Sequence, residues 1–272
     1  MSDLDQFIDN QLAQGRSFFS REEVQAALEI KPQTLTAAIT RLVRKQHLAN
    51  PRRDFYLILR PEDRVSGSPD PARWIDGLMR HQGVDYRISL LRAAAFHGSS
   101  HQAAMVFQII VPRQMREIVI GRHRIQFVYQ SPDAFRSSNL PQNIDQLKTD
   151  AGFAKVADPE LTLLDCMRYF HHVGGISTVA QIVKDIGGKT TPRHLNQLAS
   201  FFDTATVRRL GYLLELCGYE RQSEALAHQV KNTKTALALD PSVQSITALH
   251  SGPYEKNAKW NLIINEIVEI DF

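Results

Sequence analysis

The sequence predicts an α+β protein with an N-terminal winged helix-turn-helix, residues 1–60, and a larger mixed α/β C-terminal domain, residues 72–272. Two observations predict the first domain: a helical segment whose outer face is polar and then basic, and a short hairpin with arginines at its tip directly after it. Helical periods that alternate with β-branched runs after residue 72 predict the second domain. Nothing in that second pattern names a particular fold.

The N-terminal elements follow in the order that a winged helix requires. An amphipathic helix from Leu4 to Leu12 precedes a short apolar strand at residues 17–19. Ser20 and Glu23 have the S-x-x-E spacing of a capping box, in which each side chain hydrogen-bonds the backbone N–H of the other residue. They therefore open a second helix, whose inner positions are Val24, Ala27 and Leu28.

A third helix is predicted from Pro32 to about residue 45, because proline suits a first helical turn, where no hydrogen bond is lost. Its inner face carries an apolar stripe at helical spacing: Leu35, Ala38, Ile39, Leu42 and Val43. The turn-rich residues 50–54 and the aromatic and apolar run from Phe55 to Leu59 predict a two-stranded wing. Together these segments predict a recognition helix followed by its wing.

The outer face of this helix and the wing tip predict a site for double-stranded DNA. The predicted DNA-binding residues are Gln33, Thr34, Ala37, Thr40, Arg41, Arg44, Lys45, Arg52 and Arg53. Arg41 and Gln33 are the best candidates for reading bases, because arginine pairs bidentately with guanine and glutamine with adenine. Arg44 and Lys45 would lie towards phosphate, and the wing arginines would reach the backbone or the minor groove.

The charge distribution supports this interpretation better than the net charge of +3 does. Residues 31–60 contain seven cations and one anion, Asp54, whereas residues 1–30 contain two cations and six anions. The positive charge is thus local to the predicted recognition helix and wing. A three-helix protein-interaction module remains the alternative, because amphipathic helices with basic faces are common.

Residues 61–71 have the composition of a linker, with three prolines, a glycine and two serines. After it, helices are expected at 72–83, 88–96, from Asp158-Pro159, from Thr191-Pro192, around 207–217 and at 221–230. Strands are expected at 105–111, 117–120, 124–129, 153–156 and within 260–270. The helix after Asp158 is expected to have one buried and one charged side.

Motifs for catalysis or metal binding are weak. Gly188-Lys189-Thr190 resembles the end of a phosphate loop, but Val183 stands where that motif needs glycine. His97 and His101 have zinc-like spacing without a cysteine or carboxylate nearby, and His171-His172 suit a helix C-terminus. Asp158 and Glu160 have a structural role at a helix start, which leaves Asp165 without a partner for acid–base chemistry. We therefore expect no enzyme, no cofactor and no metal site.

The two cysteines, Cys166 and Cys217, lie in apolar helical contexts and are expected to be buried free thiols in a reducing cytoplasm. No apolar run approaches the roughly 20 residues of a membrane span, and the acidic N-terminus is unlike a signal peptide. The expected protein is cytoplasmic and has no membrane partner.

Several segments, in their order along the chain, resemble the AbiEi-type antitoxins of type IV toxin–antitoxin systems. They are GRSFFSREEVQAAL, LTAAITRLVRKQHLANPRRDFYLIL, WIDGLMRHQGVDYRISLLRAAAFHGSSHQAAMVFQIIV, VADPELTLLDCMRYFHHVGG and VRRLGYLLEL. The resemblance implies a bacterial autorepressor that binds inverted repeats in its own promoter through the N-terminal domain. It also implies that the C-terminal domain, residues 72–272, counteracts a nucleotidyltransferase-like toxin, AbiEii, in abortive infection and phage defence.

Two functions of different class remain open from the sequence. The first is the DNA-binding antitoxin, and the alternative is a winged-helix transcriptional regulator whose C-terminal domain senses a ligand and which has no toxin partner. An enzyme with a DNA-targeting domain is a third and weaker hypothesis. A nucleotidyltransferase-like reading frame directly downstream would favour the first.

Overall fold

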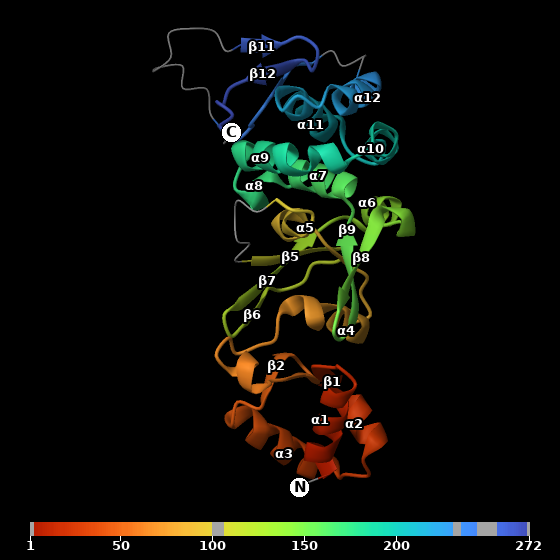
Figure 1. Ribbon diagram of the computed structural model, residues 1–272, viewed down its shortest axis with the longest axis vertical. Helices are drawn as coiled ribbons and strands as arrows, with labels where there is room; N and C mark the ends of the chain where they lie inside the picture. Colours follow the sequence, from red (N-terminus) through yellow and green to blue (C-terminus); the bar gives the residue numbers. More distant parts are fainter. Residues whose placement is uncertain (1–2, 100–105, 231–234, 244–254, 271–272) are drawn as a thin grey trace. The chain divides into compact units, whose positions relative to one another are not determined.

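The computed structural model describes residues 3–99, 106–230, 235–243 and 255–270 (Figure 1). The chain is an α+β protein that divides into two compact units. Unit 1 contains the described residues within 1–88, 105–132 and 145–156, and unit 2 contains those within 89–104, 133–144 and 157–272. The division does not follow the order of the chain, because each unit takes up several separate segments.

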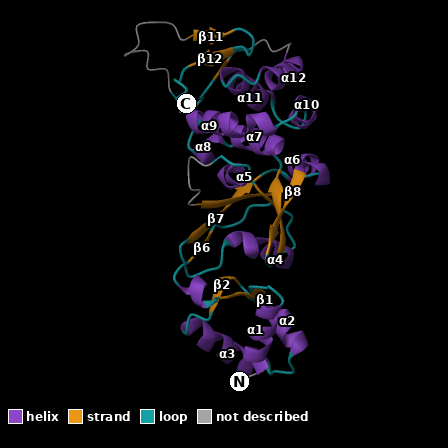
Figure 2. Cartoon of the chain, in the orientation of Figure 1, coloured by secondary structure: helices purple, strands orange, loops and turns teal. Residues whose placement is uncertain are grey.

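Unit 1 begins with the elements of a winged helix. They are α1 (Asp3–Ala13), β1 (Phe18–Ser20), α2 (Arg21–Ala27), α3 (Pro32–Arg44), β2 (Leu48–Arg52) and β3 (Phe55–Ile58). The strands form an antiparallel sheet in the order β1-β3-β2, with Phe19 opposite Tyr56 and Leu48 opposite Ile58. In Figure 2 the three helices lie together at the N-terminal end, beside β1 and β2. This is the topology that the sequence predicts.

An apolar core joins the three helices to the small sheet. Leu35, Ile39 and Leu42 of α3 pack with residues of the other elements: Leu4, Phe19, Val24, Leu48, Tyr56 and Ile58. The capping box at α2 is confirmed, because Glu23 N donates to Ser20 Oγ at 3.1 Å and Ser20 N donates to Glu23 Oε2 at 2.6 Å. Two predicted core positions are wrong: Ala27 is exposed, and Val43 is 37% exposed because it lies at the edge of the α3 stripe.

The rest of unit 1 is built on a mixed sheet. Its order is β6-β7-β5-β4-β9-β8, formed by β4 (Arg87–Ile88), β5 (Val106–Val111), β6 (Ile118–Ile120), β7 (His123–Tyr129), β8 (Ile144–Thr149) and β9 (Gly152–Ala157). β5 runs parallel to β7 and antiparallel to β4, which in turn runs parallel to β9. The predicted hairpin of β6 and β7 is present. β8 was not expected, because its alternating polar residues give little strand signal.

Residues 61–71 are part of unit 1 rather than a boundary between the two units. They include the 3-10 turn η1 (Pro61–Arg64) and lead into η2 (Pro71–Arg73) and α4 (Ile75–His81). Arg73 binds both carboxylate oxygens of Asp150 at 2.7 and 2.5 Å, and the Trp74 indole N–H donates to the carbonyl of Pro69 at 3.1 Å. Whether residues 1–60 and 72–272 fold independently stays a prediction.

Unit 2 is mainly helical. Its helices are α5 (Leu90–Phe96), α6 (Pro132–Ser138), α7 (Pro159–Arg168), α8 (Phe170–Val173), α9 (Ile176–Ile186), α10 (Pro192–Ala199), α11 (Thr204–Leu216) and α12 (Glu220–Val230), with 3-10 turns η3 (Pro141–Asn143) and η4 (Gly187–Lys189). A small sheet in the order β10-β12-β11 comprises β10 (Leu237–Ala238), β11 (Glu255–Asn257) and β12 (Leu262–Ile264). Arg208 of α11 is 2% exposed and donates to the carbonyls of Thr235, Trp260 and Asn261. This arginine fastens α11 to the segments that carry the sheet.

α7 lies at the centre of unit 2. All eight residues from Glu160 to Met167 are buried, because α5, α9, α10 and α11 all pack against this helix. The prediction of one buried and one charged side is therefore wrong for α7. The segment 88–96 was predicted as one helix but divides into the end of β4 and α5, with Leu90 at a positive φ of 57° directly after the strand. None of the helices in the described residues is long and apolar enough to cross a membrane.

Candidate nucleic-acid interface

α3 presents the predicted recognition residues to solvent. Leu35, Ile39 and Leu42 are buried beneath the helix, so the opposite face is the one that is free. All seven residues predicted on this helix are exposed: Gln33, Thr34, Ala37, Thr40, Arg41, Arg44 and Lys45. The structure thus brings them together on one face within four helical turns.

The cations of α3 lie in and just after its last turn. In the part of the chain that the structure describes, no hydrogen bond or ion pair engages the side chains of Arg41, Arg44 or Lys45. Cations near a helix C-terminus also interact favourably with the helix dipole. Their positive charge is therefore available to an anionic partner such as phosphate.

Two threonines of α3 make side-chain hydrogen bonds within the protein. Thr40 donates its hydroxyl to the carbonyl of Thr36 at 2.8 Å, so it offers only its oxygen lone pairs outward. Thr36 donates to the carbonyl of Pro32 and accepts from Arg21 Nη2, both at 2.8 Å. Arg21 also donates to the Pro32 carbonyl at 3.1 Å, which ties the start of α2 to the start of α3. This contact between α2 and α3 was not predicted from the sequence.

The wing is held in a tight turn by local hydrogen bonds. Asn50 Nδ2 donates to the carbonyls of Arg52 and Phe55 at 2.7 and 2.8 Å, and Asp54 has a positive φ of 59°. Aspartate tolerates the left-handed region better than most residues, so Asp54 suits this place. The turn leaves the Arg53 side chain 95% exposed, with one ion pair to Asp54 at 3.3 Å.

Arg52 differs from Arg53 in its surroundings. Its guanidinium donates to the carbonyl of Arg116 and lies 5.7 Å from the centre of the Phe127 ring. Burial, and then the nearby charge of Arg116, lower the pKa of Arg52. The structure therefore places Arg53 in solvent and Arg52 against the β5–β6 loop and β7.

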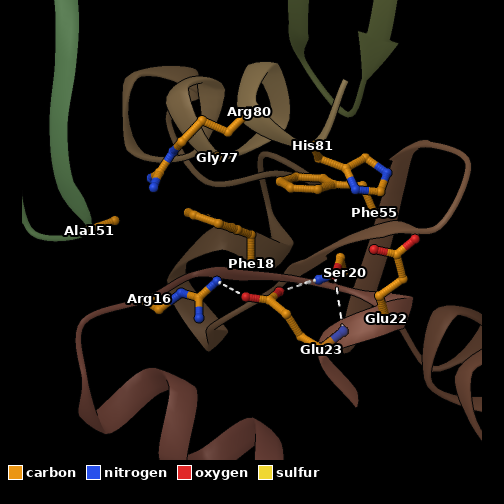
Figure 3. A pocket seen from close by; sticks show the side chains of 10 residues that line it. All are labelled: Arg16, Phe18, Ser20, Glu22, Glu23, Phe55, Gly77, Arg80, His81 and Ala151. Atoms are coloured by element: carbon orange, nitrogen blue, oxygen red, sulfur yellow. Dashed lines mark hydrogen bonds and ion pairs between the residues drawn. The ribbon is translucent and has the colours of Figure 1, made fainter. Parts of the chain in front are cut away.

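Two cavities lie beside the winged helix within unit 1. One of about 500 Å³ opens next to α3, and its lining residues are Asp3, Leu4, Ile30, Thr34, Ala37, Ala38 and Arg41. A second of about 520 Å³ lies between the winged helix and α4 (Figure 3). Figure 3 shows Phe18 in its middle, the Arg16–Glu23 ion pair of 2.6 Å below, and Phe55 beside His81.

Beside the second cavity, the winged helix packs closely on α4. The Phe18 ring occupies the space where a side chain at Gly77 would be, 2.2 Å from the position of a Cβ atom. Phe18 and Phe55 stack with ring centres 5.3 Å apart. Phe18, Phe55 and Gly77, which line this cavity, thus pack the winged helix on α4.

In unit 2 the structure assembles a polar cluster that the sequence does not show. Asp158 caps α7 as predicted, with Oδ1 accepting from Leu161 N at 2.7 Å. Glu160 accepts from Thr191 N at 2.7 Å, so it caps α10, whereas the Thr191 side chain does not. His194 lies 2.8 Å from Asp158 Oδ2, and these three side chains are close enough to hold a metal ion. His194 was missed because it is 34 residues from Glu160.

The other candidate polar residues have structural partners. Asp165 accepts from Ser89 Oγ at 2.7 Å inside unit 2, and a ring nitrogen of His97 lies 2.7 Å from the carbonyl of Ala157. His101 lies outside the described residues. Gly188-Lys189-Thr190 follows α9 and includes the end of η4, which agrees with a loop before α10.

Both cysteines are free thiols. Cys166 is buried, as predicted, whereas Cys217 is only partly buried, so the prediction for it is wrong in degree. Burial raises the pKa of both thiols, for Cys217 to about 11. Neither is therefore a reactive thiolate near neutral pH.

Comparisons with known proteins bear on both the domain and the fold. Residues 87–216 match the family model described as the AbiEi antitoxin C-terminal domain. The crystal structure of the RV2827C protein from Mycobacterium tuberculosis is similar in fold, with a TM-score of 0.61 and 16% sequence identity, over 94% of this chain and 89% of that chain. No curated protein sequence matches the chain.

Proposed function

We propose that the chain acts in a type IV toxin–antitoxin system both as repressor and as antitoxin, because residues 87–216 match the AbiEi antitoxin C-terminal domain. In this proposal the winged helix binds inverted repeats in the protein's own promoter. The C-terminal domain, residues 72–272, counteracts an AbiEii-like nucleotidyltransferase toxin. The role is regulatory rather than catalytic, in the cytoplasm, and belongs to phage defence by abortive infection.

The observation that carries the DNA-binding proposal is the exposed face of α3. Arg41, Arg44 and Lys45 project from a helix whose other side is buried, and their side chains have no partners among the described residues. A helix of this kind fits the major groove, where Arg41 and Gln33 would reach base edges. Arg44 and Lys45 would contact phosphates, as would Arg53 from the wing.

The DNA test is promoter binding by fluorescence anisotropy from 50 to 200 mM salt. We expect the double variant Arg41→Ala, Arg44→Ala to lose sequence-specific binding, because each well-placed base contact is worth about 1–3 kcal/mol. Arg136→Ala is the matched control, since Arg136 is an exposed arginine of unit 2 that pairs with Asp133. Wild-type affinity in the double variant would show that α3 is not the recognition helix.

The antitoxin test is growth with the downstream toxin gene induced. Full-length protein and the fragment 72–272 should restore growth, whereas the fragment 1–60 should bind promoter DNA without restoring growth. Rescue by fragment 1–60 alone would show that protection works through repression of the operon. If every fragment is soluble and none rescues, the ligand-sensing regulator without a toxin partner becomes the better explanation.

A further inference from the structure

Three ligand-type side chains of unit 2 meet where α7 and α10 begin. Asp158 and Glu160 are 6% and 5% exposed, and His194 lies at the rim with 26% of its side chain exposed. One ligand atom from each of the three residues lies within 4.8 Å of the others. They come from two different helices, so this is a tertiary cluster rather than a sequence motif.

The backbone of a helix start holds one oxygen of each carboxylate. Asp158 Oδ1 accepts from Leu161 N, and Glu160 Oε1 accepts from Thr191 N, each at 2.7 Å. Hydrogen bonds of this kind orient carboxylates that bind metals. The second oxygen of Asp158 contacts His194 Nε2 at 2.8 Å. The second oxygen of Glu160 has no hydrogen-bond or ion-pair partner among the residues that the structure describes.

The negative charge of the cluster is incompletely balanced. Among the described residues, neither Asp158 nor Glu160 pairs with a lysine or an arginine. The N-termini of α7 and α10 offset part of this charge. A bound cation would balance the remainder.

We propose that Asp158, Glu160 and His194 bind one divalent cation of the zinc type. Two carboxylate oxygens and one imidazole nitrogen are ligands that Zn²⁺ accepts at about 2.0–2.2 Å, with donor atoms about 3.3 Å apart in a tetrahedron. The 2.8 Å between Asp158 Oδ2 and His194 Nε2 would need to widen by only about half an ångström. The cation takes the place of the proton between these two atoms, which is released to solvent.

The cation would join α7 to α10. Thr191 and His194 belong to the start of α10, and Asp158 and Glu160 belong to the start of α7, so one ion would crosslink two helices of the domain at residues 87–216. The exposed edge of His194 leaves room for water as the fourth ligand. The expected role is to stabilise unit 2, and it does not depend on the proposed function.

The test is calorimetric titration of the chelator-treated full-length protein with Zn²⁺. We expect one equivalent to bind and the thermal midpoint to rise with zinc concentration. Glu160→Gln keeps a carbonyl acceptor for Thr191 N but removes the charge, so it should weaken zinc binding at least about tenfold while the protein stays folded. His194→Ala should do the same. Glu224→Gln and His228→Ala, exposed residues of α12, are the matched controls and should bind zinc as the wild type does.

Co²⁺ provides a second readout that excludes the cysteines. Binding at the cluster should give visible d–d bands without the intense near-ultraviolet band of a cobalt–thiolate bond. A thiolate band, no binding of Zn²⁺, or full-strength binding by both Glu160→Gln and His194→Ala would overturn the proposal. Loss of zinc binding in those two variants alone would support it.

Discussion

The two arginines of the wing offer a sharp test of the structure, because they are adjacent in sequence and differ in environment. Arg53 is 95% exposed, whereas Arg52 contacts the Arg116 carbonyl and the Phe127 ring. Arg53→Ala should remove one phosphate contact, reduce the slope of log affinity against log salt by about 0.9, and leave stability unchanged.

Arg52→Ala should have the opposite effects on stability and on the salt dependence of DNA binding. It removes a hydrogen bond worth about 0.5–1.5 kcal/mol and a cation–π contact worth about 0.5–1 kcal/mol. The free energy of unfolding should therefore fall by about 1–2.5 kcal/mol, with the salt slope of the folded protein unchanged. Urea unfolding followed by circular dichroism measures the first quantity, and promoter binding at several salt concentrations measures the second.

Two results would refute this distinction. If Arg52→Ala lowers the salt slope as much as Arg53→Ala does and leaves stability intact, Arg52 contacts DNA and its place against Phe127 is not maintained on the operator. If Arg53→Ala changes neither affinity nor slope, the wing does not reach the phosphates at all.

Two further predictions concern how the winged helix is held. Gly77→Ala should destabilise the protein by about 1–3 kcal/mol in urea unfolding, because its methyl group would lie 2.2 Å from the Phe18 ring. Gly188→Ala is the control and should destabilise the protein much less, because its methyl group would lie at an ordinary 3.5 Å from Tyr219. Equal losses of stability in the two variants would contradict the packing of Phe18 on α4. Burial raises the pKa of Glu23, but the hydrogen bond from Ser20 N and the ion pair with Arg16 outweigh burial and lower that pKa below its usual 4.5. The stability that Glu23 contributes should therefore be present above pH 4.5 and be lost as the pH falls through the lower pKa of the folded state. Unfolding free energies measured from pH 3 to 6 should show a weaker acid dependence in Glu23→Gln than in the wild type, and an identical dependence would rule this contribution out.

The local elements of the winged helix follow from residues that are close together in the chain. The capping box of Ser20 and Glu23, the proline at the start of α3 and the hairpin of the wing each depend on residues within a few positions of one another, and all are present. The apolar stripe of α3 also predicts its exposed face, because helical periodicity relates positions on the same helix. These are short-range relations, which a single sequence contains.

Tertiary structure decided the features that depend on contacts between distant segments. Arg52 and Arg53 have the same side chain. Their environments differ because Arg116 and Phe127, more than 60 residues later in the sequence, contact Arg52. Residues 160–167 of α7 are all buried because α5, α9, α10 and α11 pack against this helix, although its charged residues predict a surface. Glu160 caps α10, and His194 joins Asp158, through distances that the sequence does not contain. Hydrophobic and hydrogen-bond patterns in the sequence predict which face of a segment is buried. They do not predict which other segment packs against that face, because this depends on the packing of the whole unit.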